Sequence, residues 1–317
     1  MSTLVPDLKP DDVIQFSHVS KWYKDVIGIN QVTLGIGPGV TGLLGPNGAG
    51  KSTMMKLMTG QLRPDTGTMQ VAGKNPWNDS TVFREMGYCP DTDSFYEEMN
   101  AQQFVILMGR MAGYSAAESR RRAEESLARV SMAAHMKRKI RGYSKGMRQR
   151  TKLAAALIHD PNILILDEPL NGLDPMGRHE MLTLFKELGR SGKTVLVSSH
   201  ILHEIENLTQ QIALIHHGRI LAEGQIEDIR ALIENQPLTL RVETPDRHRV
   251  GAELAAMETV SSLSYAEDDN SVVVRSNRPE SVYETLQTGV VERKYSVDGL
   301  TALDDNLDAV FSYLVKE

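Results

Sequence analysis

The stretch GPNGAGKST, residues 45–53, combines glycines with a lysine and two hydroxyl side chains at the spacing of a phosphate-binding loop. Glycine permits close backbone approach, so consecutive N–H groups can point at phosphate oxygens. We expect Lys51 to place its charge at the β- and γ-phosphates, Ser52 to bind Mg²⁺ and Thr53 to reach an α-phosphate oxygen. The residues predicted to surround the phosphates are Gly45, Pro46, Asn47, Gly48, Ala49, Gly50, Lys51, Ser52 and Thr53.

The residues on both sides of this loop predict the elements that must hold it. A short apolar run precedes Gly45, which favours a strand, and an apolar repeat with helical spacing follows Thr53. Met54, Met55 and Met58 in that repeat are expected to fill the core of the protein. A strand, a glycine-rich loop and a helix in this order are the context in which the phosphate-loop pattern is specific.

Two adjacent acids, Asp167 and Glu168, follow the apolar run NILIL at residues 162–166. A continuous apolar run of this length indicates a buried parallel strand, and its carboxyl end lies on the edge of the sheet where ligands bind. Asp167 is expected to hold Mg²⁺, through water, and Glu168 to orient and polarise an attacking water. Acids before Pro169 can also cap a helix, but beside a phosphate loop the catalytic interpretation is favoured.

A third apolar run, TVLV at residues 194–197, ends in Ser198, Ser199 and His200. In a parallel sheet its end lies on the same edge as Asp167. His200 is therefore predicted either to donate to the γ-phosphate or to cap the following helix. The position of His200 alone leaves both roles open.

The segment GYSKGMRQR, residues 142–150, predicts a helix that begins at Ser144. A capping hydroxyl, unpaired N–H groups and the positive end of the helix dipole all suit an anion. Lys145, Arg148 and Arg150 stand beside them. A second phosphate-binding element is thus expected far from the first in sequence.

Composition limits the classes of protein that fit. The 317 residues suffice for one large domain and a small one, and the net charge of −6 gives no general attraction to nucleic acid, which is not expected as a partner. Cys89, the single cysteine, excludes an internal disulfide and is expected to be a buried thiol in a reducing compartment. We expect no signal peptide, and the apolar runs are shorter than the ~20 residues that span a bilayer.

The motifs GPNGAGKST, YSKGMRQR, ILILDEP, NGLD and SSH occur here in the order found in the ATP-binding cassette ATPases. From about residue 13 to 230 the sequence resembles the nucleotide-binding subunit of an ABC transporter. The form SKGMRQR is similar to the branch that works with separate membrane subunits of the ABC-2 export type. The resemblance implies an α/β fold, a P-loop NTPase cassette with a mixed sheet core and a helical subdomain at about 92–145.

The resemblance also implies roles for residues that the chemistry alone leaves open. Two cassettes would meet head to tail, so that Ser144 and Gly146 hold the γ-phosphate bound to the other copy and Asp174 lies across the interface. Tyr23 would stack on adenine, and His200 would be the family's switch histidine. The implied cofactors are ATP and Mg²⁺, and the implied partners are a second copy and an integral membrane permease at the cytoplasmic face of the membrane.

Three positions depart from the family pattern. Asp91 occupies the place of a glutamine that contacts Mg²⁺ and the attacking water. Aspartate can reach a metal through water, but it is shorter and cannot donate a hydrogen bond, which puts its role in coupling in doubt. Tyr143 and Lys145 stand where leucine and glycine are commoner, and Lys145 is expected to be a solvated charge.

The chain is predicted to form two domains, a cassette over residues 1–234 and an α+β accessory domain over 238–317. The pattern βαββαβ in the second part, with its last strand at residues 290–297, predicts a ferredoxin-like sandwich. A terminal helix is expected over residues 306–317. No catalytic constellation is recognised there.

The resulting hypothesis is an ATPase subunit that drives export through a separate membrane protein by dimerising on MgATP. A soluble ABC ATPase acting on DNA or ribosomes is the alternative. It is disfavoured because the chain carries one cassette and no sustained heptads between Lys51 and Asp167. A regulatory ATP-binding module with little hydrolysis stays open because of Asp91.

Overall fold

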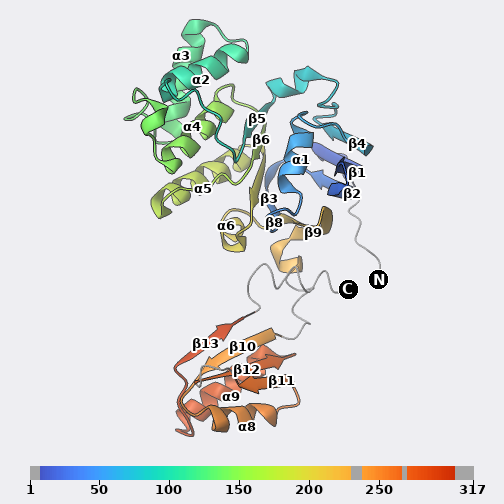
Figure 1. Cartoon of the computed structure of the whole chain (residues 1–317), viewed down its shortest axis with the longest axis vertical. Helices are drawn as coiled ribbons and strands as arrows, with labels where there is room; N and C mark the ends of the chain where they lie inside the picture. The colour runs from blue at the N-terminus through green and yellow to red at the C-terminus, as the bar shows by residue number, and fades with distance from the viewer. Residues whose placement is uncertain (1–7, 230–237, 266–269, 304–317) are drawn as a thin grey trace. The chain divides into compact units, whose positions relative to one another are not determined.

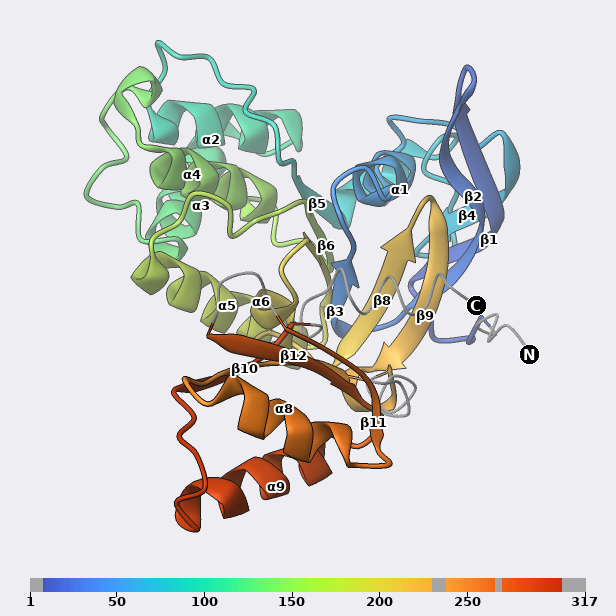
Figure 2. The ribbon, with the colours of Figure 1, turned by 60° about the horizontal axis from the view of Figure 1, so that its bottom comes forward.

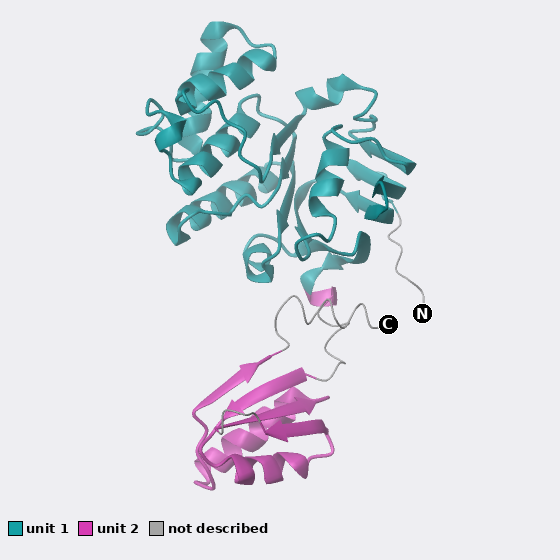
Figure 3. Cartoon of the chain, in the orientation of Figure 1, with its two compact units in different colours: residues 1–226 teal, residues 227–317 magenta. Residues whose placement is uncertain are grey.

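The computed structural model describes residues 8–229, 238–265 and 270–303. The chain divides into two compact units, Met1–Ile226 and Glu227–Glu317 (Figure 3). The sequence analysis predicts this boundary between residues 234 and 238. Residues 230–237 lie outside the described residues.

A six-stranded sheet forms the centre of the first unit (Figure 1). In spatial order its strands are β5 (Met86–Cys89), β6 (Ile163–Leu166), β7 (Thr194–Ser199), β3 (Gly39–Leu44), β8 (Gln211–His216) and β9 (Arg219–Gln225). All neighbours are parallel except β8 and β9. Every residue of β6 and β7 is buried, as their apolar composition requires of central parallel strands. The predicted mixed sheet is confirmed.

A second, antiparallel sheet consists of β2 (Val26–Ile36), β1 (Ile14–Tyr23) and β4 (Thr66–Val71). Its apolar side chains, Phe16 and Leu34 among them, form one core cluster with those of helix α1 (Lys51–Met58). Met54, Met55 and Met58 are fully buried in this cluster, so their prediction as core residues is confirmed. The helix that carries the phosphate loop is thus anchored by both sheets.

The remaining helical elements of the first unit are η1 (Ser80–Arg84), α2 (Ala101–Met111), α3 (Ala116–Arg129), η2 (Ile140–Gly142), α4 (Lys145–Leu157), α5 (Pro175–Arg190) and α6 (Leu202–Glu206). Helices α2, α3 and α4 pack together as one lobe (Figure 1). Ser115 caps α3 by accepting a hydrogen bond from the Glu118 N–H at 3.2 Å. Local capping therefore fixes where the helices of this lobe begin.

The second unit contains β10 (Leu238–Glu243), α8 (Arg247–Ala255), β11 (Val260–Tyr265), β12 (Ser271–Ser276), α9 (Pro279–Val291) and β13 (Gly299–Ala302). The strand order is β11-β12-β10-β13, and all neighbours are antiparallel. Two interleaved βαβ units give this order, which is the one that the ferredoxin-like prediction requires. Both helices lie on one face of the sheet (Figure 2).

The strand predicted at residues 290–297 is wrong. Helix α9 continues to Val291, and the last strand begins only at Gly299. Arg293 adopts a left-handed φ of 58°, which ends the helix, and Tyr295 turns back into the core, where it is 7% exposed and lies against Gly289. The predicted helix over residues 306–317 lies outside the described residues. No helix within the described ranges has the length and apolarity needed to cross a bilayer.

Candidate nucleotide site

The phosphate loop connects the end of β3 to the start of α1, as predicted. Gly48 and Gly50 have φ angles of 81° and 114°, a region that side chains with a Cβ avoid. Gly50 is also the residue before the helix and makes no side-chain cap, so the first N–H groups of α1 remain available to a ligand.

Lys51 is 6% exposed, and its ammonium is held inside the loop. Nζ donates to the carbonyl oxygens of Gly45 and Pro46 at 2.5 and 3.2 Å and pairs with Glu168 Oε1 at 3.4 Å. The cation therefore lies between the loop and the acidic end of β6, where it can bind phosphate oxygens.

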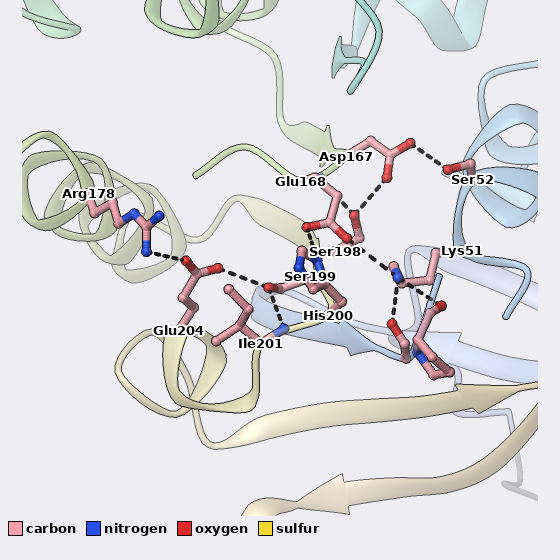
Figure 4. A network of polar contacts seen from close by, with 12 residues as sticks. Lys51, Ser52, Asp167, Glu168, Arg178, Ser198, Ser199, His200, Ile201 and Glu204 are labelled. Carbon is pink, nitrogen blue, oxygen red and sulfur yellow. Dashed lines mark hydrogen bonds and ion pairs between the residues drawn. The ribbon is translucent and has the colours of Figure 1, made fainter. Parts of the chain in front are cut away.

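Asp167 accepts two hydrogen bonds that fix its carboxylate (Figure 4). Ser52 Oγ donates to Oδ2 at 2.9 Å, and Ser198 Oγ donates to Oδ1 at 2.7 Å. The structure thus brings together the two residues predicted to hold a metal, Ser52 from α1 and Asp167 from the end of β6.

Glu168 has a left-handed φ of 48°, which is unfavourable for a residue with a side chain. Its N–H donates to Ser198 Oγ at 2.9 Å, and its Oε2 lies 3.0 Å from His200 Nδ1. Its Oε1 has no hydrogen-bond partner among the described residues, with only the ion pair to Lys51 nearby. Burial raises the pKa of this carboxyl group, and the charges of Lys51 and His200 oppose that rise.

His200 contacts Glu168 and does not cap the following helix. Helix α6 has Ile201 at its N-cap position and lacks a side-chain cap. The capping alternative for His200 is therefore wrong, and the histidine joins the carboxylate cluster (Figure 4).

Tyr23 lies at the end of β1, next to the phosphate-loop helix. Its hydroxyl is 3.4 Å from Thr53 Oγ1, and a Cβ at Gly28 would lie 2.7 Å from its ring. The tyrosine is 42% exposed. Its free ring surface beside α1 suits stacking on a base.

Ser144 begins α4 as predicted, and its hydroxyl accepts from the Met147 N–H at 3.3 Å. Gly146 packs against the loop 171–174, because a Cβ there would be 3.0 Å from the Gly172 carbonyl oxygen. Ser144 and Asp174 are exposed. In the described part of the chain no contact joins Ser144, Gly146 or Asp174 to the phosphate loop.

The arginines beside Ser144 form ion pairs with carboxylates of their own chain. Arg148 binds both oxygens of Glu97 at 2.7 and 2.8 Å, and Arg150 binds Glu180 at 2.7 Å. They attach α4 to neighbouring segments. The sequence gives no local signal for these partners.

Asp91 is exposed, and no contact of its side chain with Ser52 or Asp167 is found among the described residues. Its carbonyl oxygen and that of Pro90 accept from Lys152 Nζ at 2.8 and 2.9 Å, and Asp93 pairs with the same ammonium at 3.0 Å. Cys89 is fully buried, as predicted, and burial raises its pKa to about 12.

Sequence reasoning assigned no role to four residues of the polar network around the site, namely Ser198, Ser199, Glu204 and Arg178 (Figure 4). Ser198 connects Asp167 to the backbone of Glu168. The available signal was a pair of hydroxyl residues at the end of an apolar strand, just before a histidine.

A phosphate loop, paired carboxylates at the neighbouring strand end and a histidine on one of them define a P-loop ATPase. The profile of the family described as "ABC transporter" matches residues 29–171. The daunorubicin/doxorubicin resistance ATP-binding protein DrrA of Streptomyces peucetius is 31% identical over 94% of this chain and 92% of its own length. The bacitracin transport ATP-binding protein BcrA of Enterococcus faecalis is 31% identical over 96% of both chains.

Solved structures agree with these relatives. The ATP-binding subunit of an ABC transporter is 30% identical with a TM-score of 0.64, over 70% of this chain and 93% of that one. The dimeric structure of MJ0796, a bacterial ABC transporter cassette, is 25% identical with a TM-score of 0.63, over 67% and 98%. The chain belongs to the ABC transporter family as an ATP-binding subunit, and it is an ATPase. This membership favours the transporter interpretation over a soluble ABC ATPase.

Proposed function

We propose that this subunit powers export through a separate membrane permease by pairing with a second copy on MgATP at the cytoplasmic face of the membrane. The relatives include proteins named for drug resistance, for bacitracin transport and, in Paraburkholderia xenovorans at 34% identity over 68% of this chain, for Nod factor export. One structural observation supports pairing above all. The phosphate loop and its carboxylates form one cluster, while Ser144, the other predicted phosphate ligand, is exposed on another lobe.

The residues of the cluster divide the chemistry among themselves. The N–H groups of the loop and Lys51 bind the β- and γ-phosphates, and Tyr23 stacks on the adenine. Glu168 orients and polarises the attacking water, and His200 holds the Glu168 carboxylate and donates toward the γ-phosphate. The pKa of Glu168 is raised by burial, so ATP turnover should fall at acid pH as the carboxylate takes up a proton.

The donor set beside the loop fits Mg²⁺, because it consists of a hydroxyl and carboxylates and includes Glu168 Oε1, which accepts no hydrogen bond from the described residues. Ser52 and Asp167 would hold the ion, with Asp91 as a ligand through water. Bound Mg²⁺ would neutralise charge on the phosphates.

Ser144 and Gly146 complete the pocket of the second copy, and Asp174 lies at the same interface. A hydrogen bond from Ser144 to a charged oxygen contributes about 1.5–3 kcal/mol, and the dipole of α4 adds roughly 0.3–1 kcal/mol. Loss of the γ-phosphate removes these contacts and opens the pair. This opening would drive the membrane partner.

The variant Glu168→Gln tests the proposal because it retains the size of the side chain and removes its charge. With ATP it should elute as a dimer in size-exclusion chromatography, and without nucleotide as a monomer. The double variant with Lys51→Ala is the control, which should stay monomeric in ATP because the phosphates are no longer held. A Glu168→Gln protein that remains monomeric at saturating ATP would contradict the proposal.

A further inference from the structure

A second polar network lies beside the carboxylate cluster and has no part in the chemistry above (Figure 4). Its centre is Glu204 on α6. One Glu204 oxygen, Oε1, pairs with Arg178 Nη1 of α5 at 3.0 Å, and the other, Oε2, accepts from Ser199 Oγ of β7 at 2.9 Å. Three elements that are separate in sequence therefore meet on one carboxylate.

Burial strengthens the connection that the Glu204 carboxylate makes between Arg178 and Ser199. Glu204 is only 8% exposed, and both of its oxygens are bonded. A buried ion pair with hydrogen bonds to both oxygens is costly to break, because removal of one partner leaves a charge without compensation. The Arg178 side chain is 42% exposed, so solvent weakens its end of the pair.

The Ser199 end of the network fixes the backbone around His200. Ser199 Oγ donates to Glu204 and also accepts from the Ile201 N–H at 3.0 Å. The residues on both sides of His200 are thus held by one hydroxyl. The His200 ring lies 3.0 Å from Glu168.

The Arg178 end of the network fixes the loop 171–174. Arg178 Nε donates to the Leu173 carbonyl oxygen at 3.2 Å, directly before Asp174. The same loop touches the start of α4, where Gly172 packs against the Lys145 side chain. This end of the network therefore reaches the region assigned to the second copy.

We propose that Arg178 and Glu204 are positioning residues that hold the His200 segment and the loop 171–174 in a single arrangement. A shift of this loop on contact with the second copy then moves His200 relative to Glu168. The inference rests on the proposed roles of His200 and of the pairing of two copies.

The main test is the ATP turnover of Glu204→Gln in the purified full chain. Glutamine retains the size and can still accept from Ser199, but it no longer pairs with the Arg178 charge. Misplacement of a catalytic group by about 1 Å costs up to about a hundredfold, so we expect kcat to fall about ten- to a hundredfold. The affinity of the monomer for a fluorescent ATP analogue should change less than about twofold, because the phosphate loop is untouched.

The effect of Glu204→Gln on kcat in a chain that already carries His200→Ala distinguishes a positioning role from a merely structural one. Residues that act through one another are non-additive. If Glu204 acts through His200, adding Glu204→Gln to His200→Ala should lower kcat no further. Arg178→Lys keeps the charge beside Glu204 and should retain more turnover than Arg178→Gln.

The matched control is Asp160→Asn, which breaks the 3.0 Å ion pair with Lys193 before β6 and should leave kcat unchanged. Turnover of Glu204→Gln within twofold of the parent would overturn the inference, and so would a full additive loss in the His200→Ala background. An unchanged kcat of His200→Ala itself would instead contradict the proposed function. Thermal melts identify any variant that fails to fold, and Arg178→Gln, whose side chain is less buried than that of Glu204, then carries the test.

Discussion

The two halves of the predicted nucleotide site are built in opposite ways. At the carboxyl edge of the central sheet, Lys51 pairs with Glu168, and the Ser198 hydroxyl connects Glu168 to Asp167, so this half is held by the core of its own chain. At the start of α4, Ser144 is exposed, and its hydroxyl makes a local helix cap. The comparison teaches that the chain itself preforms one half for phosphate, whereas the other half can reach a phosphate only in the pairing of two copies that we propose.

The largest effect should come from Lys51→Ala in the preformed half. Loss of a cation at the phosphates is expected to lower ATP turnover at least about a hundredfold. Lys56→Ala is the matched control, because Lys56 is exposed on the same helix. A steady-state assay checks both, and turnover of the Lys51 variant equal to that of the control would refute the phosphate-loop assignment.

Ser144→Ala tests the half of the site at the start of α4. We expect turnover to fall about tenfold, since a hydrogen bond to a charged oxygen is lost, while nucleotide binding by the monomer stays the same. The variant also loses a helix cap, worth about 1 kcal/mol. Ser115→Ala is the control because it removes the equivalent cap of α3. If both variants lose turnover equally, the effect is one of stability and the comparison fails.

Ser198→Ala tests how the preformed half is held. The serine is fully buried, donates to Asp167 and accepts from Glu168, so its loss should cost about 1–3 kcal/mol of stability and several-fold in kcat. Ser276→Ala in the second unit removes a hydroxyl that also donates and accepts, and it should leave kcat unchanged. Urea unfolding and turnover measure the two effects, and an undiminished kcat in Ser198→Ala would argue against a role in the site.

The smallest effect concerns Glu223 of β9, which like Glu168 has a pKa raised by burial, here to about 7, with Asp12 adding to the rise. The pKa of Glu223 in the folded state exceeds its ordinary value. The contribution of this carboxyl group to the free energy of unfolding is therefore present at pH 4 and is lost as the pH rises through about 7. Glu223→Gln should therefore gain about 1 kcal/mol over the parent between pH 5 and pH 8, with turnover unchanged. Urea unfolding at both pH values checks this, and an equal difference at both would contradict it.

The parts of the fold that follow from local sequence were predictable. The strand, loop and helix around Lys51, the strand before Asp167 and the helix start at Ser144 each depend on residues within a few positions. The end of α9 was not predictable in this way, because it depends on Tyr295 packing on Gly289 after a left-handed turn at Arg293. Val290 and Val291 are β-branched and favour a strand locally, which is why a strand was predicted where the helix continues.

The site shows the same limit. Spacing identified Lys51, Ser52, Asp167 and Glu168, but it could not give the partners of Arg148 and Arg150, which lie 51 and 30 residues away in sequence. Spacing also could not decide between the two roles predicted for His200. That choice depends on where Glu168 lies in the folded chain.

Lys152 has a consequence for the unusual residue at position 91. Its ammonium holds the segment after β5 by two main-chain oxygens, and every amino acid offers such an oxygen. The path of that segment is therefore independent of whether residue 91 is an acid or an amide. The side chain at position 91 can therefore be exchanged without a change in the backbone that carries it.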